Sequence, residues 1–401
     1  MAEGPNVPLL DLKPQYLALK AEIDAAIQAV VDSQYFILGP TVSDFETDCR
    51  EYCEVPHALG CASGSDALLL ALMALLPGVP RIRGQVICPS YTFFATGGAI
   101  SRIGLTPVFA DIDPVTYNMC PEHTAALAEE CDNLLAIMPV HLYGQACDID
   151  AMLEIGERHG VPVIEDAAQA LGTRDAHGTM VGSRGAVGTW SFFPSKNLGG
   201  FGDGGLCTTA DPDIAERIRI LRVHGMEPKY YHQEVGINSR LDALQAAVLK
   251  VKLKHLEEWH AGRIDNASFY DAAFAEAGAS TSMTPLSEGG FPLRTPHANP
   301  APARHIYNQY VIRVPGELRD ELRAHLSEQG IGSEIYYPVP LHMQDCFADL
   351  GYAPEDLPES FRAAQETIAL PIYPDLTDEQ RSHVASTVVS FMNQHAACMQ
   401  Q

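Results

Sequence analysis

The chain has 401 residues, of which 46% are hydrophobic and 19% charged, a composition typical of a folded globular protein. Its 51 acidic residues against 26 lysines and arginines give a formal net charge of −25, so we expect neither a nucleic-acid partner nor an anionic membrane surface. The sequence contains no run of about 20 apolar residues, which is the length that spans a bilayer, and residues 1–5 do not resemble a secretion signal. We therefore expect a cytoplasmic protein with reduced cysteines, and the absence of C-x-x-C pairs predicts no zinc site.

In chain order, the hydrophobic pattern first predicts a helix over residues 14–33. From about residue 58 to residue 209, short apolar strands then alternate with helices. The expected strands cover residues 86–88, 107–110, 134–140, 161–165, 189–193 and 206–209, and the expected helices cover residues 65–76, 93–103, 121–130 and 149–159. Continuous apolar strands that alternate with helices predict an α/β fold with a mostly parallel sheet flanked by helices on both faces.

The pattern changes in the second half of the chain. A long helix is expected over residues 239–275. The elements expected after it are a strand over residues 310–314, a helix over 317–329, a strand over 334–337 and a last helix from residue 378. This order predicts a small α+β domain. We expect a large α/β domain over residues 1–258, which includes the N-terminal helix, and a smaller domain over residues 259–401.

A lone lysine follows one of the expected strands. Lys196 lies between the apolar run of residues 189–193 and a glycine-rich turn over residues 199–205. A lysine at the end of a buried strand is costly unless it is paired or used chemically. Taken alone, the segment is also compatible with a surface lysine in a hairpin.

Two acids end another expected strand, at Glu165 and Asp166. In an open α/β sheet the ligand lies outside the carboxyl ends of the strands, where Asp166 would point into the crevice and could pair with a protonated pyridine nitrogen. The alternative is that one of the two acids caps a following helix.

Two further segments have ligand-binding potential. Residues 62–66 are small or polar and precede a strongly helical run, so their backbone N–H groups could hold a phosphate, although an ordinary helix cap is the simpler interpretation of this segment alone. Tyr91 lies at a strand-to-helix turn, where it could cover a planar ring or pack between helix and sheet.

Together these segments resemble one family. The stretches S63–L68, Y91–F93, E165–Q169 and P194–G199 are similar to those of the DegT/DnrJ/EryC1/StrS family of aminotransferases, in the same order along the chain. The resemblance implies the fold-type I aminotransferase fold, pyridoxal 5′-phosphate as the cofactor, and nucleotide-linked keto sugars as substrates. It extends from about residue 7 to residue 375.

The resemblance also implies residue roles. Lys196 would bind the cofactor covalently and move the proton, and Asp166 would hold the ring nitrogen protonated. Gln169 would reach the 3-hydroxyl region of the ring and Tyr91 would stack on its face. The phosphate would be held by Gly64, Ser65 and Asp66, helped by Ser191.

Residues 236–242 resemble the family's loop in which an asparagine reaches the cofactor phosphate of the neighbouring subunit. The matching residue here is Asn238, which implies a homodimer with shared active sites. The alternative is that Asn238 or Ser239 caps the long helix.

Substrate contacts are less well defined. His141 follows a strand and either lines the cleft or is structural, whereas His305, Tyr336 and His342 match family positions on the sugar-nucleotide side. The loop over residues 197–205 resembles that of members that aminate C3 of a 3-keto sugar. We therefore expect transfer from glutamate to C3 of a nucleotide-linked 3-keto hexose, for amino-sugar or polysaccharide synthesis. The alternatives are a 4-aminotransferase of the same family, and a non-catalytic regulator that binds pyridoxal phosphate or a nucleotide sugar.

Overall fold

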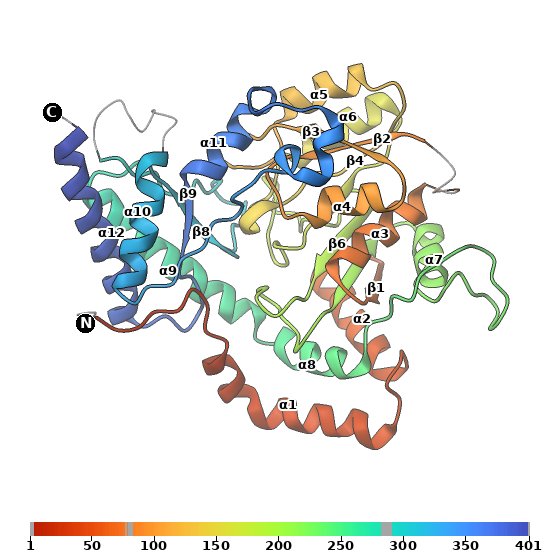
Figure 1. The fold of residues 1–401 in the computed structure, drawn as a ribbon. Coiled ribbons are helices and arrows are strands. Elements are labelled where there is room, and N and C mark those ends of the chain that lie inside the picture. The colour runs from red at the N-terminus through yellow and green to blue at the C-terminus, as the bar shows by residue number, and fades with distance from the viewer. Residues whose placement is uncertain (1–3, 77, 79–82, 282–290, 400–401) are drawn as a thin grey trace.

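The computed structural model describes residues 4–76, 78, 83–281 and 291–399. It has a large α/β part and, at its other end, a smaller α+β part that contains both chain ends (Figure 1). The long helix α9 (Leu256–Glu276) runs from the first part into the second. The α/β class expected from the sequence is confirmed.

The large part is built on seven strands. They are β1 (His57–Cys61), β2 (Gln85–Pro89), β3 (Thr106–Ala110), β4 (Leu134–Ile137), β5 (Ile164–Asp166), β6 (Val187–Ser191) and β7 (Gly205–Thr209). Ladders arrange them in the orders β1-β7-β6-β5 and β3-β2-β4, and two parallel bridges, Ile137–Val163 and Val140–Asp166, join these groups. The ladders of β2 with β3 and β4, and of β5 with β6, are parallel, whereas both ladders of β7 are antiparallel. The expectation of a mostly parallel sheet is confirmed.

Helices cover both faces of these strands (Figure 1). They are α1 (Lys13–Ser33), α2 (Pro40–Cys53), α3 (Gly64–Leu75), α4 (Ala95–Arg102), α5 (Pro121–Glu130), α6 (Ile149–His159), α7 (Pro212–Leu221) and α8 (Ala243–Leu253). Neighbouring strand residues point to opposite faces, so Ile87 packs in the cluster under α5 and α6 while Cys88 packs in the cluster under α3 and α4. Apolar side chains on both faces explain why the strands read as continuous apolar runs.

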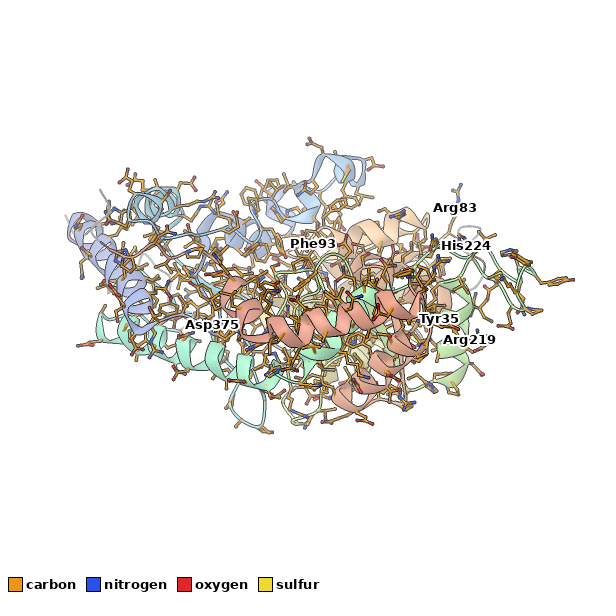
Figure 2. The ribbon with its side chains drawn as sticks, turned by 90° about the horizontal axis from the view of Figure 1, so that it is seen from below. Tyr35, Arg83, Phe93, Arg219, His224 and Asp375 are labelled. Carbon is orange, nitrogen blue, oxygen red and sulfur yellow. The ribbon has the colours of Figure 1, made fainter. Side chains whose placement is uncertain are left out.

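The N-terminal helix lies on the outside of the large part. Figure 2 shows α1 across the face seen from below, with Tyr35 just beyond its C-terminal end. Its buried residues Leu19, Ile23 and Val30 belong to a cluster that also contains Val248 and Val251 of α8. This periodic apolar face is the pattern from which the helix was predicted.

Some elements differ from the expectation. The long helix expected over residues 239–275 is two helices, α8 and α9, separated at Lys254 and His255. The break separates the part that packs on α1 and α2 from the part that packs on α12. Strand β1 and helices α2 and α7 were not predicted.

The small part contains two antiparallel strands and several helices. Its elements after α9 are β8 (Tyr310–Arg313), α10 (Gly316–Glu328), α11 (Pro358–Glu366), β9 (Thr367–Leu370) and α12 (Asp378–Met399); the short 3-10 turns of the chain are Leu142–Gly144, Leu341–Met343, Asp345–Leu350 and Pro354–Asp356. The prediction of a strand over residues 334–337 is wrong. Of these residues, only Glu334 forms a β-bridge, with Ala369, and the strand that pairs with β8 is β9.

Most of the small part shares one hydrophobic cluster. It contains residues of α9, β8, α10, β9 and α12, together with Val7 from the start of the chain. We retain the division after residue 258 as a proposal, with residues 4–10 packed on the second part. None of the helices in the part of the chain that the structure describes is long and apolar enough to cross a membrane.

Candidate active site

Asp166 is the last residue of β5, at the carboxyl end of the parallel strands. Its backbone N–H donates to the carbonyl of Pro139 (2.9 Å), and its carbonyl accepts from the N–H of His141 (3.0 Å). The carboxylate is only 4% exposed; Oδ1 accepts from the N–H of Ala168 (3.2 Å) and Oδ2 from the hydroxyl of Thr96 (2.8 Å). Burial raises the pKa of Asp166 above its usual value, and the two donors act against that rise.

The alternative role of Asp166 as a helix cap does not apply here. Residues 167–170 form a turn rather than a helix, and the bond to Ala168 closes a local turn of the backbone. The carboxylate is therefore buried at the carboxyl end of β5, where the sequence predicted a ligand-facing acid.

Lys196 lies in the turn after β6, where its backbone N–H donates to the carbonyl of Phe193 (2.8 Å). Burial lowers the pKa of the Lys196 amine to about 8, and the charge of Asp166 opposes part of this shift. The two residues are thus near enough for their charges to interact. An amine with this pKa is partly neutral near pH 7, which a nucleophilic lysine requires.

The turn that carries Lys196 is tied to the small part by its next residue. The side-chain amide of Asn197 donates to the carbonyl of Ile306 (3.2 Å), and its oxygen accepts from Asn308 (2.7 Å). Asn197 is buried, so these bonds lie in the interior.

Helix α8 holds the glycine-rich loop that follows. Gln245 accepts a hydrogen bond from the N–H of Phe201 (2.8 Å), and the amine of Lys252 donates to the carbonyl of Gly199. Lys252 is only 6% exposed, and burial lowers the pKa of its amine to about 8. Lys252 is therefore a second lysine with a lowered pKa, and its amine is committed to a backbone carbonyl.

The start of α3 faces Ser191 at the end of β6. Ser63 is the cap, and its hydroxyl accepts from the N–H of Asp66 (3.1 Å). The N–H groups of Gly64 and Ser65 lie at the first positions of the helix, where no earlier carbonyl of the helix can accept them. A Cβ added at Gly64 would lie 2.6 Å from the Cβ of Ser191, so only glycine allows this approach.

The two aromatic candidates at the turn after β2 have different positions. Tyr91 has no exposed surface, and its hydroxyl donates to the carbonyl of Tyr336 (2.5 Å). Phe93 is 56% exposed, and its ring centroid lies 6.0 Å from that of Tyr337. A ring must be accessible to contact a ligand, so this geometry favours Phe93 over Tyr91 as the stacking residue. The role of Tyr91 stays a prediction that its burial disfavours.

Gln169 uses both ends of its amide within the protein. Its oxygen accepts from the N–H of Tyr143 (2.7 Å), and its nitrogen donates to the hydroxyl of Tyr337 (2.9 Å). Tyr337 therefore reaches the crevice from the small part and lies close to Asp166. The predicted contact of Gln169 with the cofactor is not tested by these bonds.

His141 and Glu165 form a buried pair behind the site. Three backbone N–H groups within residues 182–185 donate to the Glu165 carboxylate at 2.6–2.9 Å, and His141 Nε2 lies 2.9 Å from it. His141 Nδ1 accepts from the N–H of Cys147 (3.1 Å), so the ring is neutral with its proton on Nε2. Both ring nitrogens are engaged and the side chain has no exposed surface, which favours the structural alternative for His141.

The other three predicted substrate residues are mostly enclosed. His305 stacks on Tyr307 with ring centroids 3.9 Å apart, and burial lowers the pKa of His305 to about 3. His342 is 2% exposed, and its Nδ1 lies 2.6 Å from the hydroxyl of Ser90. Tyr336 is half-buried, and its carbonyl accepts from the hydroxyl of Tyr91. Their contacts with a substrate stay predictions.

Asn238 lies on an exposed segment. The helix α8 begins after Asp242, and the hydroxyl of Ser239 accepts from the N–H of Ala62 (3.1 Å), so neither Asn238 nor Ser239 caps it. Residues 223–238 project beyond α7 (Figure 1), and their exposed apolar side chains are Tyr230, Tyr231 and Val235. The exposure of Asn238 is compatible with a contact to a neighbouring subunit.

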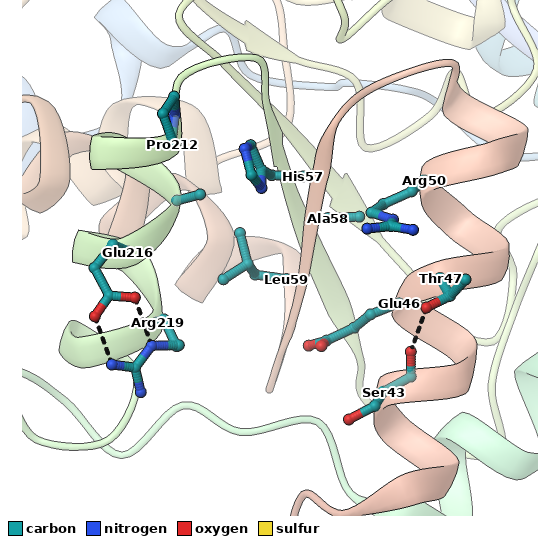
Figure 3. Close-up of a pocket in the computed structure, with 11 residues that line it drawn as sticks. Ser43, Glu46, Thr47, Arg50, His57, Ala58, Leu59, Pro212, Glu216 and Arg219 are labelled. Carbon is teal, nitrogen blue, oxygen red and sulfur yellow. Dashed lines mark hydrogen bonds and ion pairs between the residues drawn. The ribbon is translucent and has the colours of Figure 1, made fainter.

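Two other features lie outside this constellation. Within residues 4–76, 78, 83–281 and 291–399, no three or more His, Cys, Asp or Glu side chains are grouped to hold a metal ion. An open cavity of about 360 Å³ between α2, β1 and α7 is lined by Arg50, His57 and Arg219 among others (Figure 3). None of the predicted cofactor residues lines this cavity.

Sequence reasoning missed Thr96, Phe93 and Tyr337. Phe93 and Thr96 lie on the segment after β2 that was already singled out, but which of its side chains faces the crevice depends on the path of the turn. Tyr337 comes from the small part, more than 100 residues after Lys196 in the chain.

The chain is similar to known proteins over nearly its whole length. Residues 18–389 match the model of the DegT/DnrJ/EryC1/StrS aminotransferase family. The "Pleiotropic regulatory protein" of Geobacillus stearothermophilus is 46% identical over 98% of this chain and 100% of its own length. The "dTDP-3-amino-3,4,6-trideoxy-alpha-D-glucose transaminase" of Streptomyces venezuelae is 41% identical, over 96% of both chains.

A crystal structure of S. venezuelae DesV, in complex with a ketimine intermediate, has a TM-score of 0.88 at 39% identity and covers 97% of this chain and 99% of that one. This likeness confirms the fold-type I architecture expected from the sequence. On the family match and on these identities, the chain belongs to the DegT/DnrJ/EryC1/StrS aminotransferase family.

Proposed function

We propose that this protein is a pyridoxal phosphate-dependent aminotransferase that moves the amino group of glutamate to C3 of a nucleotide-linked 3-keto hexose. The observation that carries the proposal is that Lys196 and the buried carboxylate of Asp166 lie near enough for the charge of each to shift the pKa of the other. The start of α3, which lies against Ser191, is the proposed binding site for the phosphate group of the cofactor.

The residues present fit pyridoxal phosphate. Lys196 can be bonded to its aldehyde carbon, Asp166 can accept from its ring nitrogen, and the N–H groups of Gly64 and Ser65, with Ser191 and Asp66 beside them, can surround its phosphate. The close approach of Gly64 to Ser191 leaves a cradle that a Cβ would fill. The cofactor, when bound, supplies an aromatic ring that accepts electrons from the substrate carbon.

The protein's own groups have the following tasks. Lys196 would hold the cofactor, and its Nζ would move the proton at the α-carbon of the amino donor and at C3 of the sugar. Asp166 stays anionic and holds the proton on the ring nitrogen. Phe93, whose ring is accessible, would hold the cofactor ring in place from one side. In the full cycle glutamate becomes 2-oxoglutarate, and the sugar's carbonyl oxygen is exchanged for the amino nitrogen.

Two observations support C3 as the position. The loop over residues 197–205 resembles that of 3-aminotransferases, and the 41% identical relative is named as the transaminase of a 3-amino sugar. Helix α8 holds this loop through Gln245 and Lys252, so its shape is fixed beside Lys196. Glutamate as the donor rests on the family resemblance alone.

The homodimer with shared sites is part of the proposal. Asn238 is exposed on a segment that projects from the large part and carries exposed apolar side chains. A second copy that covers this segment would bury Tyr230, Tyr231 and Val235 and would receive Asn238 at its cofactor phosphate.

Two alternatives remain, a 4-aminotransferase and a non-catalytic regulator. The 46% identical relative is named as a regulatory protein, which gives the second alternative a specific basis. Lys196 and Asp166 are both present here and near enough for their charges to interact, which favours catalysis.

One experiment separates these possibilities. The purified protein, loaded with pyridoxal phosphate, is incubated with glutamate and a panel of nucleotide-linked 3-keto and 4-keto sugars, and 2-oxoglutarate and amino sugar are measured. With the 3-keto sugars, we expect one 2-oxoglutarate and one amino sugar for each glutamate consumed. Turnover of 4-keto sugars alone would contradict the C3 assignment, and binding of keto sugar without consumption of glutamate would support a regulator.

A further inference from the structure

The Asp166 carboxylate accepts a hydrogen bond from a side-chain hydroxyl of α4. Thr96 lies in the first turn of α4, is 1% exposed, and places its Oγ1 2.8 Å from Oδ2 of Asp166. An ionised carboxylate can only accept hydrogen bonds, so the Thr96 hydroxyl is the donor. This bond joins α4 to the end of β5 across 70 residues of sequence.

A second threonine continues this arrangement. The hydroxyl oxygens of Thr92 and Thr96 lie 3.2 Å apart, and both side chains are buried. Because the single hydroxyl proton of Thr96 is used on Asp166, Thr92 must donate to Thr96. The two hydroxyl dipoles therefore point in the same direction, toward the carboxylate, and each strengthens the other.

We propose that Thr96, supported by Thr92, is a positioning residue that keeps Asp166 ionised and directed at the ring nitrogen of the bound cofactor. This inference rests on the proposed function and deepens it. A buried carboxylate loses its hydration, which favours the neutral acid, and hydrogen bonds to the anion act in the opposite direction. Asp166 has one such bond on each oxygen, from Thr96 and from the backbone of Ala168.

The other groups that face Asp166 do not replace this support. They are Lys196 after β6, His141 after β4, Cys88 of β2 and Tyr337 of the small part. His141 gives its only ring proton to Glu165, and the thiol of Cys88 and the phenol of Tyr337 have raised pKa values and stay neutral. Lys196 is the group that bonds to the cofactor, so its charge is not available to Asp166 throughout a reaction cycle.

The chain offers a matched control for a purely structural role. Thr189 of β6 is equally buried, at 1% exposed, and its hydroxyl donates to the backbone carbonyl of Glu165 (3.1 Å). Thr189→Val removes a buried threonine hydroxyl next to the same strand without touching the carboxylate of Asp166.

The test measures the affinity of the protein for pyridoxal phosphate as a function of pH, in the full chain, for Thr96→Val, Thr96→Ser and Thr189→Val. Loss of a hydrogen bond to a charged group corresponds to about one to two pH units. Cofactor affinity should fall as the pH is lowered. In Thr96→Val we expect the midpoint of this fall to lie about one to two pH units higher than in the wild type, because Asp166 is then protonated at higher pH. Thr96→Ser, which keeps the hydroxyl, and Thr189→Val should keep the wild-type midpoint.

A cofactor analogue with C–H in place of the ring nitrogen makes the test specific. We expect Thr96→Val to lose affinity for pyridoxal phosphate but to bind the analogue as the wild type does. Equal midpoints in Thr96→Val and the wild type would overturn the role of Thr96. If Thr96→Val does not fold, Thr92→Val is used, with a smaller upward shift expected and no shift counting against the proposal.

The proposed function and the role of Thr96 are distinguished by different results. If the wild type binds the analogue as tightly as pyridoxal phosphate, Asp166 does not face the ring nitrogen, and the proposed function loses its main support. If the wild type discriminates against the analogue and Thr96→Val discriminates equally, only the role of Thr96 is wrong.

Discussion

Gly64 and Ser191 approach each other so closely that a Cβ on residue 64 would lie 2.6 Å from the Cβ of Ser191. One residue begins α3 and the other ends β6, so this approach fixes the helix start against the strand that leads to Lys196. The start of α3 is proposed to hold the phosphate of the cofactor, and Lys196 is proposed to hold its aldehyde carbon. The approach of Gly64 to Ser191 fixes the distance between these two groups.

Gly64→Ala should therefore weaken cofactor binding. Overpacking of this kind costs about 1–3 kcal/mol, which corresponds to a rise of about 5- to 140-fold in the dissociation constant if the shift falls on the phosphate cradle. Equilibrium titration with pyridoxal phosphate measures it. Gly316→Ala is the control, because a Cβ there would meet no atom closer than 3.8 Å; equal affinities of the two variants would contradict the cradle.

Lys196→Ala should abolish covalent attachment of the cofactor. Borohydride reduction of the loaded wild type should leave the reduced cofactor on the peptide that contains Lys196, as seen by mass spectrometry. Lys252 is the competing candidate, because it is also buried with a lowered pKa. Lys252→Met should leave the label on Lys196, and label on Lys252 in the wild type would refute the assignment.

The rate at which the cofactor-free protein captures pyridoxal phosphate should rise with pH through a midpoint near 8. The neutral amine is the nucleophile, and burial lowers the pKa of Lys196 to about 8. Asp166 stabilises the protonated amine, so Asp166→Asn should move the midpoint to lower pH. A midpoint near that of a free lysine, about 10.4, would show that the amine is exposed to water.

Subunit mixing tests the shared site. Lys196→Ala and Asn238→Ala should each lower turnover, the second through loss of cofactor retention. In a mixed dimer with sites shared between subunits, one site has both defects and the other has none, so mixing the two variants should restore activity. If Asn238 acts within its own subunit, no site is intact in the mixed dimer and activity should not recover.

The alternation of strands and helices was visible in the sequence because strands buried on both faces are continuous apolar runs. Strand β1 was missed because its five residues include His57 and Gly60 and do not form such a run. It exists because it pairs along its whole length with β7, a contact that depends on residues about 150 positions away.

The break between α8 and α9 could not be predicted from the sequence either. No proline or glycine lies between residues 250 and 260, so local propensity predicts one continuous helix. The division depends on what each half packs against, which is tertiary information.

For the candidate site, the sequence predicted which segments meet but not which side chains face inward. Glu165 and Asp166 are neighbours on a strand and so point to opposite sides, one to the backbone of residues 182–185 and the other to the crevice. Tyr91 and Phe93 differ in the same way, since the turn that buries one exposes the other.

The two bonds of Asn197 have a mechanical consequence. Asn197 follows Lys196 directly and is hydrogen-bonded to Ile306 and Asn308 of the small part. A displacement of the small part would therefore break these bonds or move the backbone next to Lys196. The position of the small part and the position of the Lys196 backbone are thus linked through one buried amide.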